Sequence, residues 1–352
     1  MWPSNPLTDR LKLRFPIIQA PMGIITTPAL AAAVSNAGGL GGIGMWGLSA
    51  EVAGRHIAGF RQQSDGSLNV NYPIWPDPAY TAETSETMRR HLQSIYDAKG
   101  LGAVPQPQGV ASDVSPEHVA MLLEQKPEVV SFHFGLPGPE VVAAIKSAGI
   151  FIVSSATTVA EARTLERRGV DAVIAQGIEA GGHRATFSGV DIGMQPGLFS
   201  LLPQVVDAVS VPVIAAGGIA DGRTAAAAFI LGASAVQLGT AFMRCEEANM
   251  YDAHRAALAM ADDSCTLVTD LISGRPARYI RNKLIDDLVG SGLKPLPVPA
   301  QLSLTFPLGA AGDRDWAVLL SGQSAALTKD TNAAELVQRL AEETARRLRA
   351  FA

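Results

Sequence analysis

The sequence predicts an α/β protein built as a (β/α)8 TIM barrel, with helical insertions and a C-terminal extension. Eight short apolar stretches alternate with helix-type stretches between residues 15 and 242. Strands separated by helices pair in parallel through right-handed crossovers, and eight such units close into a barrel. Glycine-rich loops follow the last two strands, as in many barrels that bind phosphate. A doubly wound sheet is less favoured, because no G-x-G-x-x-G follows the first strand.

The expected strands are short apolar runs that end in glycine, proline or polar residues. The first ends in the turn Pro21-Met22-Gly23, and the last two end in Gly217-Gly218 and Gly239-Thr240. They cover residues 15–20, 40–44, 68–72, 129–134, 150–154, 172–176, 211–216 and 235–238.

The expected helices carry clear start and stop signals. Thr27-Pro28 and Ser115-Pro116 place a capping side chain before a proline at the first helical position. Ser49 caps a further helix, and Gly149 and Gly169 end two others. The predicted helices cover residues 29–36, 49–63, 83–99, 115–125, 139–148, 159–168 and 221–231, with another inside 193–210.

We expect two regions along the chain. Residues 1–270 form the barrel, with insertions near 73–127 and 184–210, and residues 271–352 form a mainly helical segment that packs on the barrel near the active site.

Composition excludes several classes of function. The net charge is −5 with no run of Lys or Arg, so no nucleic-acid surface is expected. Apolar stretches are broken well before the roughly 18 residues of a membrane span, and the N-terminus lacks signal-peptide features. Two cysteines and scattered histidines predict neither a disulfide framework nor a metal site. We therefore expect a cytoplasmic protein, monomeric or homodimeric, that acts on a small molecule.

The loop at residues 176–183, Q-G-I-E-A-G-G-H, is the strongest candidate for a catalytic site. It opens from the strand at 172–176, so it lies on the active face of a barrel. Adjacent glycines, Gly181 and Gly182, allow close approach of backbone to ligand. His183 is then a candidate general base, or a donor that stabilises negative charge on a substrate. The alternative is that His183 is a surface-loop histidine with no catalytic role.

Two further sets of residues are candidates for ligand contact. The glycines at 217, 218 and 239 predict a phosphate site, although they also suit tight turns. Amides at strand ends, such as Asn69 and Asn71, suit the edge of a flat heterocycle, but they equally satisfy loop backbone.

His133 lies inside the strand at 129–134, with Phe132 and Phe134 expected on the opposite face. It either faces a ligand, as a substrate contact, or is a structural histidine; the residues favour the structural interpretation.

Together, residues 19–23, 69–71, 176–183, 215–219 and 237–242 closely resemble the nitronate monooxygenase family, formerly called 2-nitropropane dioxygenases. Residues 273–278 resemble a later motif of that family, and the resemblance extends over about residues 13 to 285. It implies an FMN-dependent barrel in which His183 is the catalytic histidine. The implied cofactor contacts are Ala20, Pro21, Met22, Gly23, Asn69, Gln176, Gly181, Gly182, Ala216, Gly217, Gly218, Gln237, Gly239 and Thr240.

The implied reaction is oxidation of alkyl nitronates by O₂ to a carbonyl compound and nitrite, with one-electron transfer to the flavin. Neutral nitroalkanes are also substrates if His183 removes their α-proton. Two alternatives stay open. The E-A-G-G-H loop also occurs in NAD(P)H-dependent FMN reductases for quinones or enoyl thioesters, and residues 297–325 lack the Tyr and Lys found in many bacterial nitronate monooxygenases. A non-redox phosphate-binding barrel is the third possibility.

Overall fold

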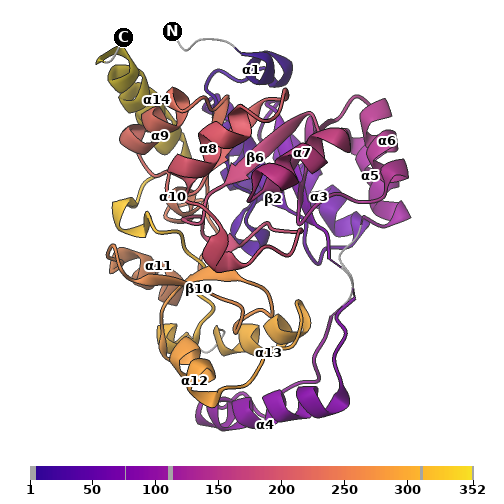
Figure 1. Cartoon of the computed structure of the whole chain (residues 1–352), viewed down its shortest axis with the longest axis vertical. Coiled ribbons are helices and arrows are strands. Elements are labelled where there is room, and N and C mark those ends of the chain that lie inside the picture. The colour runs from indigo at the N-terminus through magenta and orange to yellow at the C-terminus, as the bar shows by residue number, and fades with distance from the viewer. Residues whose placement is uncertain (1–4, 76, 110–113, 310–311, 351–352) are drawn as a thin grey trace.

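The computed structural model describes residues 5–75, 77–109, 114–309 and 312–350, and a barrel of eight parallel strands stands at its centre (Figure 1). The strand order is β1-β9-β8-β6-β5-β4-β3-β2, and an Ile18–Leu40 bridge beside β2 closes the circle. The predicted fold class is confirmed, and each expected strand is present. They are β1 (Ile17–Gln19), β2 (Gly41–Gly44), β3 (Leu68–Pro73), β4 (Val129–His133), β5 (Phe151–Ala156), β6 (Ala172–Gln176), β8 (Val213–Ala216) and β9 (Ala235–Leu238).

Side chains alternate between the outside and the inside of the barrel, as the two-residue period of a strand requires. On β3, Leu68 and Val70 join the core between sheet and helices. Asn69 pairs with Val129, which belongs to the apolar interior, so the Asn69 side chain also faces inward. The same reasoning places Gln176 inside, next to Ala216. The candidate polar residues therefore share the barrel interior.

The amino-terminal end of the interior is filled and closed. Ile18, Val129 and Ile174 pack there with Leu7 and Leu11 of α1 (Pro6–Leu11). This helix was not predicted, because six residues are too few for a periodic signal. With that end closed by apolar side chains, a ligand has access only at the carboxyl ends of the strands.

Eight helices surround the barrel, and the last comes from the end of the chain. Helix α14 packs against α9 and α2 and so completes the ring, far along the sequence from β9 (Figure 1). The ring consists of α2 (Pro28–Asn36), α3 (Ala50–Arg61), α5 (Pro116–Gln125), α6 (Pro139–Ser147), α7 (Val159–Arg167), α8 (Leu198–Val206), α9 (Gly222–Ile230) and α14 (Ala333–Ala350).

A second layer lies below the barrel in Figure 1, with α4, α12 and α13 at its far end. Its apolar core joins Met88 and Leu92 of α4 to Leu284 and Leu304 of the C-terminal part. The layer contains α4 (Ala82–Ala98), α11 (Asp252–Ala259), α12 (Lys283–Ser291) and α13 (Ala300–Gly309), and α10 (Thr240–Met243) leads into it. Part of the insertion near 73–127 and part of the C-terminal segment thus form one body. The division at residue 270 into two domains stays a prediction.

A small antiparallel sheet connects this layer to the barrel mouth. It consists of β10 (Thr266–Thr269), β11 (Ala277–Ile280) and β7 (Gly182–His183), with His183 opposite Ala277. The sequence did not predict this sheet, because β7 has only two residues and its partner is distant along the chain. Within the described ranges, no helix is both long and apolar enough to cross a membrane.

Candidate active site

His183 is half-buried at the barrel mouth and is held at both its backbone and its ring. Its Nε2 lies 2.9 Å from Ser273 Oγ. The Ser273 hydroxyl donates to the Arg275 carbonyl oxygen at 2.9 Å and accepts from the Tyr279 hydroxyl at 3.0 Å. Because the single Ser273 proton goes to that carbonyl, His183 Nε2 carries the proton donated to Ser273. Nδ1 is then the basic nitrogen of the ring.

The surroundings of His183 keep its imidazole neutral. Burial, together with the nearby charges of His133 and Arg275, lowers the pKa of His183 from 6.5 to about 3. A neutral ring at pH 7 accepts a proton at Nδ1 and contributes no full positive charge.

The loop that carries His183 is fixed by two side chains. The Gln176 amide donates through Nε2 to the His183 carbonyl at 3.1 Å and accepts from the Ala185 N–H at 2.9 Å. Arg184 is fully buried and donates to the carbonyls of Gln176 and Gly177 at 2.8 and 2.6 Å. Gln176, expected at the cofactor, therefore uses both ends of its amide to hold this loop.

Glu161 anchors the continuation of the same loop from α7. Its Oε1 accepts from Thr186 Oγ1, the Phe187 N–H and both donors of Ser188, at 2.8 to 3.0 Å. Its Oε2 accepts from the Thr157 N–H and hydroxyl. Burial alone would raise the pKa of Glu161, but these hydrogen bonds outweigh it and lower the pKa. The carboxylate thus stays ionised as a fixed anchor.

His133 supports His183 from the neighbouring wall. Its Nε2 donates to the His183 carbonyl oxygen at 3.1 Å, and burial lowers its pKa to about 4. Phe132 faces the outer core, as expected. Phe134 does not, because it lies beyond the strand end with φ +70°, and its ring centroid is 4.5 Å from His133 and 6.0 Å from His183. The expectation that both phenylalanines share the opposite face is wrong for Phe134.

The glycine loops after β8 and β9 converge with a segment from the C-terminal part. Gly217 and Gly218 have φ of +112° and +68°, which only glycine adopts readily. Within the described ranges the N–H groups of Gly218 and Ile219 have no hydrogen-bond partner. Thr240 Oγ1 accepts from the Gly322 N–H at 2.9 Å, and a Cβ on Gly181 would lie 2.5 Å from that same nitrogen. The structure therefore brings together the predicted glycines and adds Gly322.

The floor beside these loops combines half-buried backbone with unpaired polar groups. Residues 20–23 are half-buried, and a Cβ on Gly239 would lie 3.5 Å from Met22 Sδ. Asn69 is 2% exposed, and its Oδ1 has no partner among the described residues. Gln237 and Ala216 face the interior next to each other. Ala216, Gln237 and residues 20–23 thus lie at the mouth, whereas Asn69 lies deeper, in the layer of Val129, with an unpaired acceptor oxygen.

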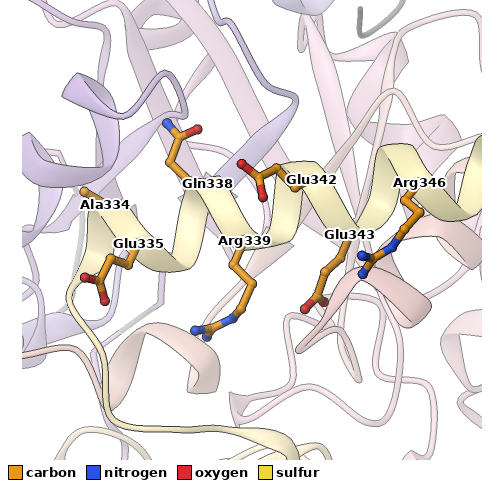
Figure 2. Close-up of a pocket in the computed structure, with 7 residues that line it drawn as sticks. All are labelled: Ala334, Glu335, Gln338, Arg339, Glu342, Glu343 and Arg346. Atoms are coloured by element: carbon orange, nitrogen blue, oxygen red, sulfur yellow. The ribbon is translucent and has the colours of Figure 1, made fainter.

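A shallow open groove lies elsewhere, along α14. Figure 2 shows its lining, which comes from one side of α14 and includes Arg339, Glu342 and Arg346. This groove runs along the outer wall of the barrel, because α14 packs on α9 and α2. Its mixed charges suit a solvated helix face, so the groove is not the candidate site.

Comparison with known proteins decides the family. The family model described as nitronate monooxygenase matches residues 4–343. A nitronate monooxygenase from Pseudomonas aeruginosa is 41% identical over 96% of this chain and 99% of its own. The chain belongs to the nitronate monooxygenase family. This membership confirms the resemblance seen in the sequence. It also confirms the predicted enzyme class, because nitronate monooxygenases are oxidoreductases.

Two solved structures place this nitronate monooxygenase family member among its relatives. A structure of nitroalkane oxidase from Streptomyces ansochromogenes superposes with a TM-score of 0.90, at 37% identity over 98% of this chain and 99% of that one. FabK from Thermotoga maritima superposes with a TM-score of 0.77, at 30% identity over 100% of both chains.

The sequence does not predict several residues of the candidate site. Ser273 and Arg275 belong to the stretch that resembles a later family motif, but no local pattern predicts that Ser273 bonds His183 or that Arg275 packs on Phe134. Tyr279, Gly322 and Glu161 reach the site from distant elements, so no local spacing signals them.

Proposed function

We propose that this chain uses FMN to oxidise alkyl nitronates with O₂ to a carbonyl compound and nitrite. The proposal rests mainly on His183, a neutral histidine that Ser273 holds at the mouth of the barrel. The barrel belongs to a chain that the nitronate monooxygenase family model matches. The substrates are small molecules, consistent with a site at the strand ends of a closed barrel.

The mouth fits FMN. The N–H groups of Gly218 and Ile219 have no hydrogen-bond partner among the described residues and suit a phosphate, and Gly239 and Thr240 follow the neighbouring strand β9. The unpaired Asn69 Oδ1 suits a ring N–H, and residues 20–23 offer half-buried backbone to a flat ring. Nitronate monooxygenases as a family are flavoproteins, which supports this assignment. When bound, FMN supplies the redox chemistry, accepting an electron from the substrate and passing electrons to O₂.

The protein's own residues position the substrate and handle its proton. With Nε2 committed to Ser273, His183 presents Nδ1 as a base. An anionic nitronate needs no proton removed, which suits a histidine whose pKa is lowered to about 3 and which is therefore a weak base. Gln176 and His133 both bond the His183 carbonyl, so they fix the distance of the ring from the barrel axis.

Oxygen consumption tests the function directly. We expect the purified FMN-loaded protein to consume O₂ and release nitrite with propionate 3-nitronate or a short alkyl nitronate, without NADH or NADPH. No consumption with either substrate would refute the proposal. Turnover that requires NAD(P)H would favour the reductase alternative instead.

The position of the phosphate has its own test. Gly218→Asp places a carboxylate where the phosphate is proposed, so like-charge repulsion should lower FMN retention. Gly218→Asn is the matched control, because asparagine has the same shape, tolerates positive φ and carries no charge. Flavin content after gel filtration is the measurement. Equal retention in both variants would show that the phosphate binds elsewhere.

A further inference from the structure

Arg275 stands beside His183 with its hydrogen-bonding capacity only partly used. It precedes β11 and is half-buried, with its guanidinium carbon 4.1 Å from the centroid of the Phe134 ring. One terminal nitrogen, Nη2, donates to the Thr186 carbonyl. Its Nε is buried without any partner among the described residues, and Nη1 has no recorded partner there. Stacking on Phe134 and one hydrogen bond therefore hold the side chain, and its remaining N–H groups are available to a ligand.

No acidic side chain neutralises this guanidinium. Within the described ranges Arg275 forms no ion pair. Glu161 acts on it electrostatically, but both Glu161 oxygens are occupied by hydrogen bonds from residues 157 and 186–188. The two other buried arginines of the site differ, since all three guanidinium nitrogens of Arg184 and of Arg278 donate to protein oxygens. A partly buried cation without a partner is unfavourable by itself and favourable with a bound anion.

His183 cannot take the role of that cation. Its imidazole is neutral at pH 7, and the Arg275 charge is one reason for it. Both side chains lie against Phe134, whose ring centroid is 6.0 Å from that of His183. Any anion placed against the His183 ring at this mouth therefore meets Arg275 as the nearby positive charge.

We propose that Arg275 binds the negatively charged nitro group of the substrate while Trp75 and Phe134 form the apolar wall for its chain. The Trp75 ring centroid is 5.5 Å from that of Phe134, and Trp46 packs edge-on against Trp75 at 6.0 Å. Trp75 Nε1 is a second buried donor without a partner among the described residues. A planar anion with a short apolar substituent matches these groups, and an alkyl nitronate has that chemistry. The inference rests on the proposed function.

Nitrate binding tests the anion site apart from turnover, because nitrate is a planar oxyanion that the enzyme cannot oxidise. Calorimetry would compare the FMN-loaded protein with Arg275→Met, Arg275→Lys and, as control, Arg163→Met on the exposed face of α7. We expect nitrate affinity to fall about 10- to 100-fold in Arg275→Met, as loss of a charge-assisted hydrogen bond requires. Arg275→Lys should lose less, and Arg163→Met should match the parent protein. Equal affinity in Arg275→Met, or no nitrate binding by the parent protein, would overturn the proposal.

Steady-state kinetics then separate binding from chemistry. Arg275→Met should raise KM for an anionic nitronate with a smaller effect on kcat, and nitrate should inhibit the parent protein competitively. An unchanged KM would overturn the role of Arg275 while leaving the proposed function intact. Arg275-dependent nitrate binding in a protein that oxidises no nitronate would keep the anion site and refute the proposed function.

Discussion

At the scale of single residues, the site shows how surroundings set the chemistry of a histidine. A free imidazole is partly charged near neutral pH, but His183 is neutral because it is buried beside His133 and Arg275. Ser273 then decides which ring nitrogen carries the proton. We propose that Arg275 supplies the positive charge for an anionic substrate instead.

Replacement of His183 tests whether this residue takes part in the reaction. His183→Asn should lower kcat/KM by about 100-fold, the range of general acid–base or electrostatic catalysis. FMN should stay bound, because no proposed phosphate contact is changed. Steady-state rates and the flavin spectrum would be measured together. Unchanged rates would remove His183 from the reaction.

His183 and the glycine loops could be predicted as candidates from the sequence because local patterns mark them, and their roles stay predictions. Adjacent glycines and a histidine directly after an apolar strand form a signal within eight residues. Ser273 and Tyr279 carry no such signal, since their contact with His183 depends on β11 pairing with β7. Phe134 was misplaced because a strand pattern does not reveal a positive φ at the strand end.

At the scale of elements, residues 319–324 act as a brace for the active-site loop. The Gln323 N–H donates to the Glu179 carbonyl at 3.0 Å, and Gly322 lies against Gly181. Glu179 also accepts from the Leu198 N–H with both oxygens at 2.9 Å, which caps α8. The loop is thus held by both the brace and the start of α8.

Adding a methyl group at this contact should loosen the brace. In Gly181→Ala the new Cβ would meet the Gly322 nitrogen at 2.5 Å, so one segment must move. We expect weaker FMN retention and a higher KM. Gly290→Ala on α12 is the control, because its Cβ meets nothing within 4 Å. Equal flavin content in both variants would contradict the account of the brace.

The brace is in turn held by His254 of α11, which makes it sensitive to acid. His254 is 1% exposed, its Nε2 donates to the Leu320 carbonyl at 2.9 Å, and burial lowers its pKa to about 4. In the unfolded chain the pKa of His254 has its ordinary value of 6.5. As the pH falls, the unfolded chain therefore binds a proton at a higher pH than the folded chain does. The contribution of neutral His254 to the free energy of unfolding is therefore complete above pH 6.5 and is lost as the pH falls toward 4.

Urea unfolding at pH 7 and pH 5 measures this effect. The parent protein should lose about 2 kcal/mol of unfolding free energy between these pH values through His254. His254→Gln keeps a donor for the Leu320 carbonyl but does not titrate, so its loss should be smaller by that amount. The same loss in both proteins would contradict this prediction, because it would show that folding does not lower the pKa of His254.

At the scale of the whole molecule, strand and helix alternation predicted the barrel, because each βα unit has its own local period. The layer below it was harder to foresee. Its core joins α4 to distant residues of the C-terminal part, and the Tyr96 hydroxyl donates to the Leu304 carbonyl, 208 positions later. The barrel ring likewise uses α14, which the sequence places after the whole lower layer.

We propose that a nitronate, and not NAD(P)H, reduces the flavin of this barrel. The most direct measurement is the visible spectrum of the purified protein without oxygen, after addition of NADH and then of an alkyl nitronate. We expect flavin bands that do not change when NADH is added and that disappear when the nitronate is added. Rapid bleaching by NADH, or no flavin bands even after FMN is supplied, would contradict it.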